Sequence, residues 1–103
     1  MEPKKNHILE LRPYCENCNK TLPPASSEAM ICNYECTFCS DRVANVLHNV
    51  RPNCIGNFVL RPIRPQKELP QNPASKKVVH QPLDALGFQK RLENNKDVPP
   101  EKR

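Results

Sequence analysis

The stretch from Cys15 to Cys39, CENCNKTLPPASSEAMICNYECTFC, decides the fold of this chain. It holds every cysteine of the protein except Cys54. Two Cys-x-x-Cys pairs bound it, Cys15 with Cys18 and Cys36 with Cys39. Two such pairs can form one tetrahedral zinc site of four thiolates, with Zn–S distances of about 2.3 Å and no open position. The stretch therefore predicts a small module organised by a structural Zn²⁺ ion.

The size and composition of the chain favour the same interpretation. Of 103 residues, 37% are hydrophobic and 5% are aromatic, and there is no Trp. A core this thin seldom folds without a metal, disulfides or a partner. With 12 Pro and only 2 Gly, much of the backbone is expected to be stiff but irregular. A metal would supply the stability that the apolar side chains cannot.

The order of elements predicts a small α+β, zinc-finger-like domain with zinc knuckles, a short β-hairpin and one helix. A strand is expected at 30–34, and residues 35–38 continue or return it. Ser40 is expected to cap a helix with four apolar residues at i, i+3, i+4 and i+7, namely Val43, Val46, Leu47 and Val50. Pro52 ends this helix, and a last short strand follows within 55–60.

The chain divides into a cysteine-rich zinc-binding module at 8–62 and a Pro-rich basic tail at 63–103. The tail is expected to be mostly disordered, with one short helix at 82–92. No signal peptide or membrane span is evident, which favours a cytoplasmic protein. In a reducing compartment, clustered cysteines are metal ligands more often than disulfides.

Two arginines interrupt the cysteine pattern. Arg42 stands where a Cys-x-x-Cys pair beginning at Cys39 would end, and Arg51 stands where a pair ending at Cys54 would begin. With cysteine at both positions the chain would carry eight ligands in four pairs. Eight ligands in this order suit an interleaved, RING-type arrangement of two zinc ions, in which the first and third pairs share one metal and the second and fourth share the other.

Several motifs give the chain a resemblance to a known family, and they are Ile8–Pro13, the first cysteine pair, Leu22-Pro-Pro24, Ile31-Cys32, Glu35–Cys39, Pro52-Asn-Cys54 and Leu60–Pro65. Over residues 8–65 the chain resembles the bacterial family called domain of unknown function 1272. The resemblance implies a small, cysteine-rich, zinc-binding protein with a RING-like or treble-clef-like ligand pattern and no established activity. It also implies cysteine at the positions of Arg42 and Arg51, and a glycine pair where this chain has Ile55-Gly56.

Three arrangements of the cysteines remain open. The first, which needs no missing ligand, is one zinc ion held by the two complete pairs, Cys15 with Cys18 and Cys36 with Cys39. Cys32 and Cys54 would then be thiols outside the site. The second is two three-cysteine sites, one of Cys15, Cys18 and Cys39 and one of Cys32, Cys36 and Cys54. Each would be completed by His48, water or another chain, and a guanidinium could not serve as the fourth ligand. In the third, metal binding is lost and only the packing survives.

The sequence gives little reason to expect an enzyme. Catalytic zinc usually has His-rich ligands and an open position, and three thiolates leave bound water poorly acidified. The first functional hypothesis is a protein-interaction module with an unidentified protein partner. A nucleic-acid-binding zinc finger is the alternative, because residues 61–103 hold ten basic and five acidic side chains. Phe88 is the only aromatic residue there that could stack on a base. A thiol-based redox or metal-responsive protein is a third hypothesis.

Overall fold

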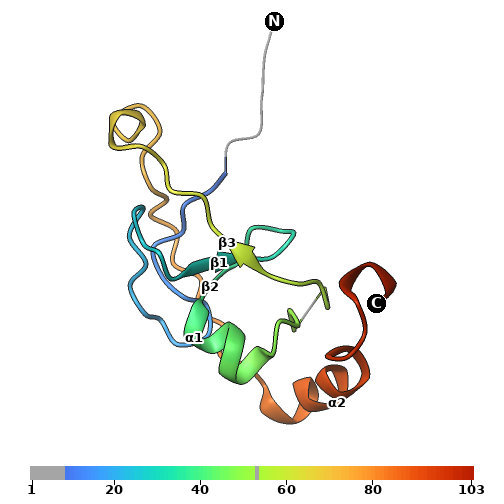
Figure 1. Cartoon of the computed structure of the whole chain (residues 1–103). Coiled ribbons are helices and arrows are strands. Elements are labelled where there is room, and N and C mark those ends of the chain that lie inside the picture. The colour runs from blue at the N-terminus through green and yellow to red at the C-terminus, as the bar shows by residue number, and fades with distance from the viewer. Residues whose placement is uncertain (1–8, 53) are drawn as a thin grey trace, which may run out of the picture.

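The computed structural model describes residues 9–52 and 54–103, and a small antiparallel sheet lies at its centre (Figure 1). The strand order is β2-β1-β3, and Met30 lies opposite both Phe38 and Leu60. The sheet is built from β1 (Ala29–Ile31), β2 (Thr37–Cys39) and β3 (Val59–Leu60). The small α+β architecture with a hairpin and a cysteine cluster thus agrees with the sequence-based expectation.

The chain between β1 and β2 forms the hairpin turn. The backbone N–H of Cys32 donates to the carbonyl of Cys36 (3.2 Å), and that of Glu35 donates to the carbonyl of Cys32 (2.9 Å). Glu35 has a φ of 64°, so the turn passes through the left-handed region. Residues 35–38 therefore return the first strand rather than continue it.

The predicted helix follows β2 directly. It begins as α1 (Ser40–Arg42) and continues as one π-helical segment, η1 (Val43–Leu47). The N-cap is Cys39, which keeps extended geometry, so the prediction that Ser40 caps the helix is wrong by one position. Three of the four predicted apolar residues are buried, and these are Val43, Leu47 and Val50. The helix ends at His48, whose φ of 48° is left-handed, so the predicted end at Pro52 is wrong and Val50 is buried beyond the helix.

The core lies between the sheet, the helix and the cysteine-rich loops. Phe38 and Phe58 meet edge to face, with ring centroids 5.2 Å apart. The other buried members of this cluster are Cys15, Leu22, Ala29, Cys32, Cys39, Val43, Leu47, Val50 and Phe88. Cysteines thus make up a large share of the interior, as expected for a metal-organised domain.

The tail differs from the expectation of disorder, because residues 63–103 fold back onto the module. They include η2 (Gln66–Glu68), α2 (Ala85–Asn95) and η3 (Pro100–Lys102). The backbone N–H of Gln81 donates to the carbonyl of Glu16, and that of Leu83 donates to the side-chain oxygen of Asn17, each at 2.9 Å. Phe88 of α2 is buried in the core. The module's own apolar residues leave a surface that the tail helix covers.

Arg61, just after β3, ties the module together from inside. Its guanidinium donates to the carbonyls of Arg12 (2.9 Å), Leu22 (3.2 Å) and Pro23 (2.9 Å), and only 4% of the residue is exposed. These carbonyls belong to the segments on either side of the first cysteine pair. Arg61 therefore joins the end of the sheet to the loop that carries Cys15 and Cys18.

Within the described part of the chain, no helix has the length and apolar character needed to cross a membrane.

Replacing Phe88 by Ala is expected to detach α2 from the module. The loss of a buried aromatic side chain should cost about 3 kcal/mol, and the free helix would be marginal in water. Limited proteolysis should then cleave residues 85–95 several times faster than in the unchanged protein. Leu86→Ala, on the same helix but 86% exposed, is the matched control and should leave the cleavage rate unchanged.

Replacing Arg61 by Met is expected to lower the free energy of unfolding by about 2–4 kcal/mol, because three buried carbonyls lose a charged donor. Chemical denaturation of the purified protein measures this change. Lys67→Met, at an exposed position of η2, is the control. A loss below about 0.5 kcal/mol, which is the usual range for surface substitutions, would contradict the role assigned to Arg61.

Candidate metal centre

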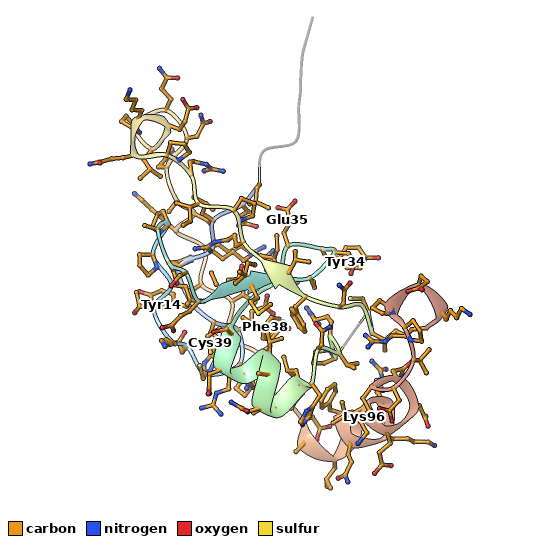
Figure 2. The ribbon with its side chains drawn as sticks, viewed as in Figure 1. Tyr14, Tyr34, Glu35, Phe38, Cys39 and Lys96 are labelled. Atoms are coloured by element: carbon orange, nitrogen blue, oxygen red, sulfur yellow. The ribbon has the colours of Figure 1, made fainter. Side chains whose placement is uncertain are left out.

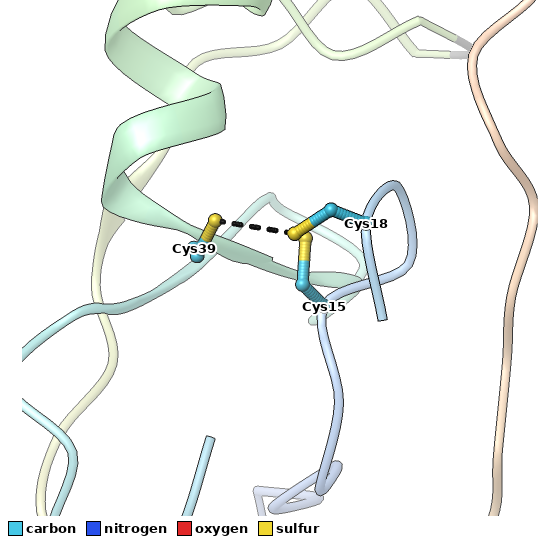
Figure 3. Close-up of side chains that lie close together, drawn as sticks. All are labelled: Cys15, Cys18 and Cys39. Carbon is cyan, nitrogen blue, oxygen red and sulfur yellow. Dashed lines mark hydrogen bonds between the residues drawn. The ribbon is translucent and has the colours of Figure 1, made fainter. Parts of the chain in front are cut away.

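Three cysteines from two separate segments converge at one end of the sheet (Figure 3). The sulfur atoms of Cys15, Cys18 and Cys39 all lie within 4.8 Å of one another, and those of Cys18 and Cys39 are 3.7 Å apart. Cys15 and Cys39 are fully buried, whereas Cys18 is partly exposed. We call these three residues the first cysteine cluster.

Local backbone geometry aims these sulfurs at a common point. The turn after Cys15 is closed by two backbone hydrogen bonds, from Cys15 to the carbonyl of Lys20 and from Asn19 to that of Cys15, each of 2.9 Å. Asn19 supplies the left-handed residue of this turn, with a φ of 62°. The backbone N–H of Lys20 then donates to the sulfur of Cys18. Donation of this kind stabilises a thiolate and is typical of a zinc knuckle.

Cys39 comes from the junction of β2 and α1. It is the last residue of the strand and the N-cap of the helix, so its side chain is held by both elements. The backbone N–H of Arg42, in the first turn of the helix, donates to its sulfur. The first cluster thus fastens the N-terminal loop to the sheet and the helix.

The first cluster fits a thiophilic metal. In a tetrahedron with Zn–S distances of about 2.3 Å the sulfurs are separated by about 3.8 Å, close to the spacing of Cys18 and Cys39. Burial, together with the neighbouring Cys15 and Cys18 sulfurs, raises the pKa of Cys39 to about 11. Three sulfurs this close can carry negative charge together only when a cation lies among them. The donor set therefore suits Zn²⁺ or another thiophilic ion.

Arg42 lies beside the first cluster, where a fourth protein ligand would be expected. Its guanidinium donates to the sulfur of Cys18. Burial alone would raise the pKa of Cys18, but the donors from Lys20 and Arg42 lower it overall. Because a guanidinium cannot ligate a metal, the described residues offer three ligands at this centre.

The remaining cysteines lie apart from the first cluster. Cys32 and Cys36 face each other across the hairpin turn, and we call this pair the second cysteine cluster. The backbone N–H of Tyr34 donates to the Cys32 sulfur at 3.3 Å, which is a second knuckle-like turn. Cys36 does not join the first cluster. Among the described residues, the first cluster matches one of the two three-cysteine sites rather than the single four-cysteine site, and Cys32, Cys36 and Cys54 form no second group of metal-ligating side chains.

Cys54 and His48 contribute to neither cluster. The sulfur of Cys54 donates to the side-chain oxygen of Asn33 at 3.0 Å, next to the second cluster. His48 is exposed at the end of the helix and lies outside the one group of metal-ligating side chains found among the described residues. Ile55 has a φ of 53°, the region that glycine adopts freely, which accounts for the glycine that the family resemblance implies at this position.

Sequence reasoning missed the structural importance of Glu16. It lies between the two cysteines of the first pair, is only 2% exposed, and binds Arg12 at 3.0 Å. On its other side, Arg51 lies at 3.8 Å. In the sequence Glu16 is one of several acidic residues near the cysteines. No local pattern predicts that two arginines from other segments enclose it.

A cavity of about 340 Å³ separates this part of the module from α2. Its walls include Glu16, Phe38, Arg51, Phe88 and Arg91. The buried ionic side chains therefore lie beneath the tail helix rather than under open solvent.

Comparison with known proteins identifies the family to which the chain belongs. Residues 8–64 match the model of a family described as a protein of unknown function (DUF1272). The uncharacterized protein R02474 of Rhizobium meliloti (strain 1021) is 50% identical over 68 residues, which cover 66% of this chain and 81% of that protein. No solved structure matches. With more than half of its length matched, the chain belongs to the DUF1272 family of proteins of unknown function.

Proposed function

We propose that the protein is a zinc-stabilised interaction module in which one ion is held by Cys15, Cys18 and Cys39. The convergence of these sulfurs from two segments carries the proposal. Thiolates select soft or borderline ions, and Zn²⁺ is the common structural ion among them. The metal would supply folding free energy by fixing the N-terminal loop to the junction of β2 and α1.

The proposed role of the metal is structural and not catalytic. Three thiolates donate enough charge to leave a bound water weakly acidic, and the first cluster offers no histidine. Arg42 adds a positive charge beside the open side of the cluster. That charge can balance the thiolates, but it cannot act as a general base.

The sheet edge supports an interaction role. β3 is an edge strand, and its side chains Val59 and Leu60 are 55% and 62% exposed. Ile63, a few residues on, is 56% exposed, and Tyr34 projects near the same strand (Figure 2). An exposed edge with apolar side chains can accept an extended peptide as an added strand. The partner we propose is therefore an extended, apolar segment of another protein.

Native mass spectrometry should find one zinc ion per chain, lost on addition of a chelator. Cys39→Ser should abolish this binding and lower the thermal stability, because it removes the ligand that links the two segments. Cys54→Ser is the matched control, since this thiol lies outside the first cluster, and it should keep one zinc. Equal metal loss in both variants would contradict the assignment of the ligands.

A charge on the sheet edge should block the proposed docking. Leu60→Lys is expected to abolish binding of a captured protein partner while leaving zinc content and folding unchanged. The measurement is titration of the purified partner against the zinc-loaded protein, with Lys67→Leu as a remote control. A nucleic acid that binds instead, with an affinity that falls steeply as salt rises, would support a nucleic-acid-binding zinc finger and overturn the proposal.

A further inference from the structure

The second cysteine cluster contains a buried cation of the protein's own. Arg51 is 6% exposed, and its guanidinium lies close enough to the thiols of Cys36 and Cys32 to interact with both. The centre of the guanidinium lies 5.4 Å from the centroid of the Phe38 ring, in cation–π geometry. A permanently charged side chain is thus enclosed by thiols and an aromatic face.

The surroundings of Arg51 are poor for a guanidinium. Its Nε atom is buried and has no hydrogen-bond partner among the described residues. Its ion pair with Glu16 is loose at 3.8 Å, because the same carboxylate binds Arg12 more closely at 3.0 Å. A site that had been shaped for an arginine would be expected to offer planar, paired oxygen acceptors. Sulfur atoms and a single shared carboxylate suit a compact metal cation better.

The two cysteine clusters are built alike. In each, a knuckle-like turn donates a backbone N–H to a cysteine sulfur, from Lys20 to Cys18 in the first and from Tyr34 to Cys32 in the second. In each, an arginine guanidinium lies close enough to a sulfur to interact with it, Arg42 with Cys18 and Arg51 with Cys36. They differ in burial, because the Arg42 side chain is 41% exposed and that of Arg51 is 8% exposed. The first cluster is open beside its arginine, whereas the second is filled by it.

We propose that the Arg51 guanidinium takes the place of a second metal ion in this module. Arg51 supplies the positive charge around which Cys32, Cys36 and Glu16 gather, and it closes the hairpin turn against the helix end. The second cluster therefore takes no metal while Arg51 is present. Cys54, held by Asn33 beside this cluster, is a ligand left without a metal.

The test converts the arginine into a ligand. Arg51→Cys places a fourth thiol near Cys32, Cys36 and Cys54, and it is expected to raise the zinc content by one ion per chain. Native mass spectrometry counts the ions, and titration with Co²⁺ reports thiolate ligation through its charge-transfer absorbance. Lys67→Cys, at an exposed position of η2, adds a thiol without removing a buried contact; it is the control and should gain no ion.

Each outcome decides the proposal. Unchanged protein that takes two zinc ions would overturn it, as would an Arg51→Cys variant that gains none or stays unfolded in excess zinc. A variant that is unfolded without metal but folds with the additional ion would support it. The result also separates this inference from the zinc-stabilised interaction module proposed for the first cluster. If the unchanged protein binds no zinc, that function fails, yet a gain of one ion in Arg51→Cys would still support the role of Arg51.

Discussion

The meeting of the first cysteine pair with Cys39 is the interaction on which the rest of the structure depends. Cys15 and Cys18 lie on an N-terminal loop with no regular structure, and Cys39 lies where β2 becomes α1. Their convergence fixes the loop against the only sheet of the described chain. A strand of three residues and a helix that runs only from Ser40 to Leu47 have little stability of their own. A cation at this point would bind both segments and make the small elements cooperative.

Buried arginines hold much of the remaining structure together. Arg61 satisfies carbonyls of the loop that carries the first pair, and Arg12 and Arg51 enclose Glu16 between the two cysteines of that pair. A carboxylate and two guanidiniums are costly to desolvate. These ion pairs therefore fix the relative positions of the segments rather than raise the net free energy of unfolding. Glu16 thereby couples the two cysteine clusters, because movement of the turn that carries Cys15 and Cys18 would take away the carboxylate that pairs with Arg51.

The sequence predicted the elements whose signals are local. The hairpin followed from the short apolar runs around 30–38, and the helix followed from apolar spacing that buries Val43 and Leu47. The tail helix was predicted at 82–92 and lies at Ala85–Asn95, but its docking onto the module was missed, because Phe88 is isolated in the sequence and the helix has a weak apolar face. Its burial depends on a surface that only the folded module presents. Long-range packing of this kind leaves no local pattern in the sequence, whereas a helix is recognisable from the periodicity of its apolar residues.

The sequence by itself determined that this is a small cysteine-rich module of a recognisable family, since the number and spacing of cysteines are visible in one dimension. Only the tertiary structure decided which cysteines meet. Spacing favoured Cys36 with Cys39 at one centre, but Cys36 directly precedes β2 and Cys39 ends it. Side chains three positions apart along an extended chain point to opposite faces, so they do not converge on one point unless a turn intervenes. In the structure, Cys39 therefore lies in the first cluster, and Cys36 lies near Cys32 and Arg51.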